Sequence, residues 1–204
     1  MSKFFSIHVL MITIGRESIF TMLESLKNEL LEKDFITIVF DSSMDNYNNV
    51  IEYCKKNFKC KYNIIYEKEK LGKWGQPYRN KYNVLEGDFV YHVDDDDIII
   101  EGSFDKVRNI LKDKDTIYVF RFISDIGHVV WTSKTISRNE IGSPSGFIPS
   151  HINDKSVWGC TYDGDWKFYK GLEKYTNKIE YINEVIYDAR RPHKKHRYVD
   201  KFKK

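Results

Sequence analysis

The chain has 204 residues, of which 41% are hydrophobic and 31% charged. This is enough material for one packed core and unlike a disordered segment, and we expect a single domain over residues 1–204. Thirty-three basic and thirty acidic residues leave a net charge of +3, too small to indicate a nucleic-acid partner by itself.

The cysteine pattern and the hydropathy of the sequence argue against disulfide-rich, zinc-binding and membrane-spanning proteins. Cys54, Cys60 and Cys160 are odd in number and have no CxxC spacing, so neither a disulfide framework nor a zinc site is indicated. No run approaches the roughly 20 apolar residues that span a bilayer, and no signal-type segment opens the chain. A cytoplasmic location is the default expectation.

In chain order, strands and helices alternate through the first half. Residues 5–13 are a β-rich apolar run, and a helix with apolar residues at helical spacing is expected after Ser18. The expected elements that follow are a strand over 35–40, a helix around 47–54, a strand over 62–66, a helix from Pro77 that stops at Gly87, a strand over 88–93, a helix after Ser103 and a strand over 117–122. Residues 124–165 are expected to be rich in loops.

This order predicts an α/β fold with a Rossmann-like, mostly parallel central sheet flanked by helices. In such sheets, ligands bind at the carboxyl ends of the strands. Thr13, Asp41 and Asp94 each follow or end an expected strand, so they are candidates for a binding site. A turn-capping role for Asp41 is the simpler alternative.

Four consecutive aspartates, Asp94 to Asp97, follow the strand over 88–93. Crowded carboxylates raise one another's pKa unless a cation neutralises them, and oxygen ligands favour Mg²⁺ or Mn²⁺. A cation held by one or two carboxylates keeps positions open for phosphate oxygens. A solvated acidic turn is the alternative, but the place of the run after an apolar strand favours a metal site.

The segment LGKWGQPYRNKYNVLEGDFVYHVDDDD, with Arg79-Asn80 upstream of a strand and a DxD sequence, resembles the donor-binding half of GT-A glycosyltransferases, especially family two. The resemblance extends from Thr13 to His193. It implies a nucleotide-sugar-binding half at about 1–100, an acceptor half at about 101–193 and a basic tail over 194–204. It also implies that Thr13 and Asp41 contact the nucleoside and that Arg79 meets the donor phosphate or sugar.

The same resemblance implies the residues of the chemical site. Asp94 and Asp96 correspond to the carboxylates that bind metal and diphosphate, with Asp95 and Asp97 as rivals. Three further correspondences lie in the second half. Gly142 and Gly146 resemble the donor loop, Asp165 resembles the catalytic base with Asp163 as the alternative, and His193 is the candidate that completes the metal site, with His196 second. The family usually has Glu where this chain has Gly164.

Simpler interpretations exist for several of these residues. Gly142 and Gly146 suit loop turns that need positive φ, and His193 lies in a basic tail. Trp158 and Trp166 could present an apolar face to an acceptor sugar, but ordinary core packing explains them equally well.

The resemblance implies a metal-dependent transferase that moves a sugar from a nucleotide-sugar, preferably a UDP-sugar, to a hydroxyl of a glycan or other acceptor, with inversion at the anomeric carbon. Two alternatives come from other classes. One is a nucleotidyltransferase with the same type of site, and the other is a non-catalytic module whose basic residues 190–204 bind nucleic acid or a membrane surface. The aspartate run would repel phosphate without a metal, so no nucleic acid is expected, while peripheral membrane contact through the tail stays open.

Overall fold

A computed structural model of the chain describes residues 4–190. Within this range the strands form one sheet in the order β3-β2-β1-β4-β8-β6-β9-β5, with β7 paired to β6. The strands are β1 (Ile7–Thr13), β2 (Phe35–Asp41), β3 (Lys61–Glu67), β4 (Phe89–Asp94), β5 (Ile98–Ile99), β6 (Ile117–Ile123), β7 (Val129–Val130), β8 (Gly146–Pro149) and β9 (Ile179–Asp188). The helices are α1 (Ser18–Leu26), α2 (Tyr47–Asn57), α3 (Gln76–Lys81), α4 (Ser103–Ile110), α5 (Ser150–Asn153) and α6 (Gly164–Leu172).

The first four long strands are parallel, as their order with intervening helices predicts. Strand β1 lies between β2 and β4, and all seven of its residues are buried. A strand with both faces covered reads as a continuous apolar run, which explains the FSIHVLMIT segment. The carboxyl ends of β1, β2 and β4 therefore meet at one edge of the sheet, where Thr13, Asp41 and Asp94 lie.

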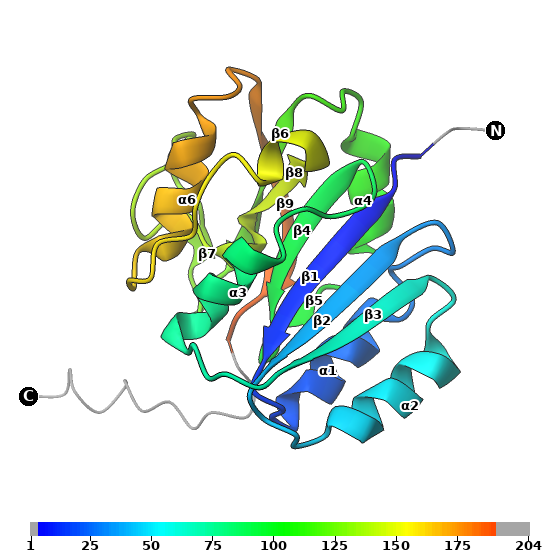
Figure 1. The fold of residues 1–204 in the computed structure, drawn as a ribbon. Helices are drawn as coiled ribbons and strands as arrows, with labels where there is room; N and C mark the ends of the chain where they lie inside the picture. The colour runs from blue at the N-terminus through cyan, green and yellow to red at the C-terminus, as the bar shows by residue number, and fades with distance from the viewer. Residues whose placement is uncertain (1–3, 191–204) are drawn as a thin grey trace, which may run out of the picture.

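Helices cover both faces of this sheet (Figure 1). Because side chains alternate along a strand, Val9 and Met11 of β1 join the core beneath α1, α2 and α4, whereas Leu10 and Ile12 pack with Tyr78 of α3 on the other face. A separate apolar cluster joins α6 to β6 and β8. Helices thus pack on both faces of the strands that lead to this edge of the sheet.

The second half holds more regular structure than the sequence predicts. Strand β8, expected to be loop, lies antiparallel between β4 and β6 and so joins the two halves of the sheet. Strand β9 pairs in parallel with β6 and antiparallel with the short β5. Helix α3 ends at Lys81, short of the expected stop at Gly87, because Tyr82 leaves helical geometry. None of the helices within residues 4–190 combines the length and apolar character needed to cross a bilayer.

Candidate active site

The aspartate run starts at the last residue of β4, beside the end of β1. Each carboxylate has a hydrogen-bond partner in the protein, and the partners come from three segments: the end of β1 with the loop that follows it, α3 and β9. The pairs are Arg79 with Asp94, Thr13 with Asp95, Arg16 with Asp96 and Tyr187 with Asp97. The crowding expected from the sequence is therefore relieved by the protein's own donors.

Asp94 pairs with the buried Arg79. The Nη2 group of Arg79 donates to Asp94 Oδ1 at 2.7 Å and to the carbonyl of Val93 at 3.0 Å. Arg79 is 1% exposed, yet its Nε and Nη1 atoms have no hydrogen-bond acceptor among the described residues. Such unpaired buried donors are costly without a partner. The Asp94 side chain is 36% exposed, the most open of the four carboxylates.

Asp95 and Asp97 are turned into the protein. Thr13 Oγ1 donates to Asp95 Oδ2 at 2.6 Å, and Tyr187 Oη donates to Asp97 Oδ2 at 2.9 Å. Burial raises the pKa of Asp95, the hydrogen bond from Thr13 and the charge of Arg16 oppose this increase, and the neighbouring carboxylates add to it. The side chain of Thr13 is thus occupied by the aspartate run, and this hydroxyl braces Asp95.

Asp41 ends β2 and anchors the loop that precedes α3. Its two carboxylate oxygens accept hydrogen bonds from the backbone N–H groups of Leu71 and Gly72, at 3.2 and 3.0 Å. In this loop residues 72–75 all have positive φ, including the non-glycine residues Lys73 and Trp74. Backbone held in this region is strained and is typical of ligand sites. The Trp74 side chain is 65% exposed at this edge of the sheet.

Asp165 lies in the first turn of α6, which brings the second half of the chain to the same edge. Ser143 Oγ donates to Asp165 Oδ1 across 3.4 Å, a long hydrogen bond. Removal from water raises the pKa of Asp165 to about 7, and the negative charge of Asp94 adds to this increase. Arg79 and Ser143 act in the opposite direction. Asp165 is therefore electrostatically coupled to both Asp94 and Arg79.

Asp163, two residues earlier, is in a different environment. It forms ion pairs with Arg138 at 2.8 Å and with Lys167 at 3.1 Å. Hydrogen bonds from Thr161 and Lys167 lower the pKa of Asp163. A carboxylate that is held as an anion by two cations is a weak base, so Asp165 is better suited to accept a proton.

The loop with Gly142 and Gly146 acts through packing, and neither glycine has positive φ. A Cβ at Gly146 would lie 2.8 Å from Tyr169 Cε1, so this position must be small for Tyr169 to fit. The Tyr169 hydroxyl accepts from the Gly146 N–H at 2.8 Å and donates to the Ser143 carbonyl at 3.1 Å. The loop thereby positions Ser143 beside Asp165, which replaces the turn interpretation of these glycines.

Of the two tryptophans considered for an acceptor platform, Trp158 is excluded by its burial. It is 1% exposed, stacks on Phe168 with ring centroids 4.2 Å apart and has the Arg79 guanidinium 5.2 Å above its ring. Trp166 is only partly buried, and Arg138 lies 4.8 Å over its ring.

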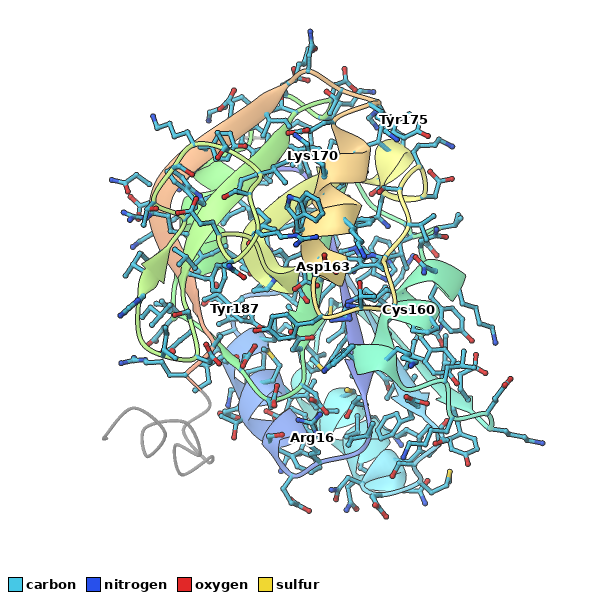
Figure 2. The ribbon with its side chains drawn as sticks, turned by 90° about the vertical axis from the view of Figure 1, so that its left-hand side faces the viewer. Arg16, Cys160, Asp163, Lys170, Tyr175 and Tyr187 are labelled. Carbon is cyan, nitrogen blue, oxygen red and sulfur yellow. The ribbon has the colours of Figure 1, made fainter. Side chains whose placement is uncertain are left out.

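Two site residues, Arg16 and Tyr187, are absent from the sequence analysis, whereas Ser143 lies in the predicted donor loop between Gly142 and Gly146. Figure 2 shows Arg16 on the loop after β1 and Tyr187 near the end of β9, far apart in the chain. Their roles depend on tertiary contacts, and the only sequence signal is the place of Arg16 directly after Gly15 at a strand end. His193, His196 and the basic tail lie outside the described residues.

Few of the described side chains at this edge could bind the predicted cation, but their oxygen atoms are ligands that Mg²⁺ and Mn²⁺ accept. Within residues 4–190, no group of three His, Cys, Asp or Glu side chains is arranged to hold an ion by itself. Asp94 engages the described residues through Oδ1, and its side chain is partly exposed. A Mg²⁺ or Mn²⁺ ion bound by one or two carboxylates and completed by phosphate and water fits this arrangement.

Comparison with solved structures finds two proteins in complex with nucleotide-sugars among the structures similar to this chain. S. aureus TarS residues 1–349 in complex with UDP-GlcNAc match with a TM-score of 0.74 and 18% identity over 90% of this chain and 58% of that one. The mannosyltransferase PcManGT from Pyrobaculum calidifontis, in complex with GDP-Man and Mn²⁺, matches with a TM-score of 0.67 and 11% identity over 95% of this chain and 59% of that one. No family model matches the chain, and no curated protein matches its sequence.

These neighbours establish the fold. The chain has a GT-A type glycosyltransferase fold, with a Rossmann-like, mostly parallel sheet, as its resemblance to that class implies. It spans about 60% of the length of TarS residues 1–349.

Proposed function

We propose that residues 1–204 form one catalytic domain of a metal-dependent glycosyltransferase similar to family two, which transfers a sugar from a nucleotide-diphosphate sugar to a hydroxyl acceptor. One arrangement carries this proposal: at the sheet edge where α/β folds bind nucleotides, Asp94 forms an ion pair with the buried Arg79, and the charges of both groups act on the pKa of Asp165. Glycosyl transfer of this type requires a base, carboxylates that bind a metal ion, and a positively charged side chain that binds phosphate. Asp165, Asp94 and Arg79 would supply these three.

Asp165 is proposed as the base. Its carboxylate accepts the proton of the acceptor hydroxyl as that oxygen forms a bond to the anomeric carbon of the donor. The bond between the anomeric carbon and the diphosphate oxygen breaks, and the electron pair leaves with the nucleoside diphosphate. The acceptor approaches opposite to the leaving group, so the anomeric configuration is inverted. Ser143 orients the Asp165 carboxylate through its hydrogen bond.

Arg79 is proposed to bind the leaving diphosphate. Its unpaired Nε and Nη1 donors are buried beside Asp94, and a phosphate oxygen is the acceptor that they lack. Asp94 and Asp96 are the proposed metal ligands, and bound Mn²⁺ or Mg²⁺ would supply Lewis-acid stabilisation of the departing negative charge. Asp95 and Asp97 are held by Thr13 and Tyr187 and are proposed to fix the run in place.

The donor nucleoside is assigned to the edge formed by Thr13, Asp41 and the loop that Asp41 anchors. The neighbours bind UDP-GlcNAc or GDP-Man, which supports a nucleotide-sugar as the donor class. A UDP-sugar is the preferred donor in this proposal.

A thermal-shift screen of UDP- and GDP-sugars with and without Mn²⁺ tests the proposal. Ligand binding to the native state raises the apparent unfolding temperature, so a donor should stabilise the wild type only with Mn²⁺. Asp94→Asn should abolish this shift in unfolding temperature. Asp154→Asn is the control and should retain the shift, because Asp154 lies at the C-terminal end of α5 and pairs with Lys155. A shift that persists in Asp94→Asn, or none with any donor, would contradict the proposal.

A further inference from the structure

Arg16 differs from the other partners of the aspartate run in its exposure. Thr13 and Tyr187 are at most 2% exposed and Arg79 is 1% exposed, whereas the Arg16 side chain is 42% exposed. Its Nη1 lies 2.7 Å from Asp96 Oδ2 and 3.7 Å from Asp95 Oδ1. Arg16 therefore places a positive charge directly on one of the two proposed metal ligands.

The backbone under Arg16 is fixed. Gly15 has φ +77°, and a Cβ there would lie 2.2 Å from the carbonyl oxygen of Asp45. The Gly15 N–H donates to Thr13 Oγ1 at 2.9 Å, and its carbonyl accepts from Asn46 Nδ2 at 2.9 Å. Any change in the position of the guanidinium must therefore come from rotation of the exposed side chain, which has a long and flexible stem.

We propose that Arg16 is a displaceable counter-ion that makes cation binding depend on the donor. This inference rests on the proposed function. Without nucleotide, the guanidinium neutralises Asp96 and competes with the divalent ion for that carboxylate. When a diphosphate binds, its oxygens attract the guanidinium away from Asp96 and so remove the charge that competes with the cation, since planar guanidinium groups recognise phosphate well.

The proposal predicts a measurable coupling between two ligands. An exposed ion pair contributes up to about 1 kcal/mol, equivalent to about a fivefold change in affinity. Mn²⁺ alone should therefore bind the wild type about fivefold more weakly than a form without the Arg16 charge. Because coupling between two ligands is reciprocal, the factor by which UDP strengthens Mn²⁺ binding should equal the factor by which Mn²⁺ strengthens UDP binding.

The test is a titration of the intact protein with MnCl₂, with free Mn²⁺ measured by electron paramagnetic resonance, first alone and then with saturating UDP. Arg16→Gln should bind Mn²⁺ alone about fivefold more tightly than the wild type, and its Mn²⁺–UDP coupling should shrink by at least that factor. Arg16→Lys keeps the charge and should bind Mn²⁺ alone as weakly as the wild type. Arg138→Gln removes a similarly exposed arginine that pairs with Asp163, and it is the matched control.

Three results would overturn the inference. Arg16→Gln could bind Mn²⁺ alone no more tightly than the wild type while both bind Mn²⁺–UDP, which leaves the proposed function standing. Arg138→Gln could show the same gain, which would indicate a general charge effect. Absence of Mn²⁺–UDP binding by the wild type would reject the proposed function as well. Circular dichroism of each variant verifies that it is folded.

Discussion

Two aspartates separated by one residue have opposite environments. Asp163 is held as an anion by Arg138 and Lys167, whereas burial and then the charge of Asp94 raise the pKa of Asp165 to about 7. A base is most effective when its pKa is near the working pH, because it is then both deprotonated and strong enough to remove a proton. These environments favour Asp165 over Asp163 as the proposed base.

The first prediction concerns this pair. Asp165→Asn should lower kcat by about 10²–10⁴-fold, the usual contribution of a general base, while UDP binding in the presence of Mn²⁺ is retained. Release of nucleoside diphosphate measures the rate, and calorimetry measures binding. Asp163→Asn is the control and should change kcat only a few-fold. The base assignment fails if Asp163→Asn shows the larger loss.

The second prediction is the pH dependence of the rate. A carboxyl with a pKa of about 7 is mostly protonated at pH 6, so kcat/KM, which reports the free enzyme, should fall as the pH drops below about 7. The charge of Asp94 contributes to the raised pKa, and a cation bound there removes that contribution. The kcat profile should therefore break at a lower pH than kcat/KM. A kcat/KM that stays constant from pH 5 to 8 would contradict the assignment.

At the scale of elements, the first half of the fold was predictable because its strands are long and apolar. β1, β2 and β4 are buried on both faces and read as continuous hydrophobic runs. β8 has only four residues, and β9 shows no regular alternation of burial, so neither carries a clear signal. Apolar residues recur visibly at every second position in a strand, or about every 3.6 positions in a helix, only when the element is long and packs one face against the core.

The site was predictable to a similar degree. Asp94 and Asp41 were predicted because each follows or ends an expected strand, and Asp165 was predicted through the family resemblance. Arg16 and Tyr187 approach the aspartates from positions that are 80 and 90 residues away in the chain. Such contacts depend on how the sheet closes, and local sequence patterns contain no information on this.

The third prediction tests the contact between β8 and α6. Gly146→Ala should cost roughly 1–3 kcal/mol of stability, because its Cβ meets Tyr169, and it should also lower the rate by moving Ser143 away from Asp165. Urea unfolding and donor turnover measure the two effects. Gly102→Ala is the control. With φ +73° and open space around its Cβ, it should lose about 1 kcal/mol through strain alone and keep its turnover.

If Gly146→Ala lost stability but kept full turnover, the loop would have no role in positioning Ser143. If Gly102→Ala lost the same turnover, the effect would follow from instability in general.

One sheet joins the two halves of residues 4–190, and both halves contribute groups to the candidate site. Arg79 and Asp94 come from the first half, and Ser143 and Asp165 from the second. Strand β8 connects them by pairing with β4 on one side and β6 on the other. Loss of this pairing would separate the proposed base from the proposed metal ligands.

The fourth prediction concerns the pH dependence of global stability. Burial lowers the pKa of His8 to about 4, and its ring nitrogens contact Thr37 Oγ1 at 2.8 Å and the Glu86 carbonyl at 3.2 Å. Below pH 6.5 the unfolded chain takes up this proton and the folded protein does not, so stability falls as the pH drops from 6.5 toward 4. His8→Gln should remove roughly 1.4 kcal/mol per pH unit of this slope.

Urea unfolding at pH 5.0 and 6.0 measures the slope. His151→Gln, which removes a histidine at an exposed position, is the matched control. An unchanged slope in His8→Gln would show that His8 does not account for the acid sensitivity. Asp165 acts with the opposite sign, because a raised carboxyl pKa favours the folded state at low pH, so the comparison must be between variants.

The position of Tyr187 also determines when the site can form during translation. Tyr187 lies 90 residues after Asp97, to which its hydroxyl donates, and it also contacts the backbone N–H of Asp94. At about 5–20 residues per second, the ribosome completes the aspartate run several seconds before it adds this tyrosine. A growing polypeptide therefore exposes four aspartates without one of their anchors, and the proposed cation site should reach its final geometry only after β9 has emerged and paired.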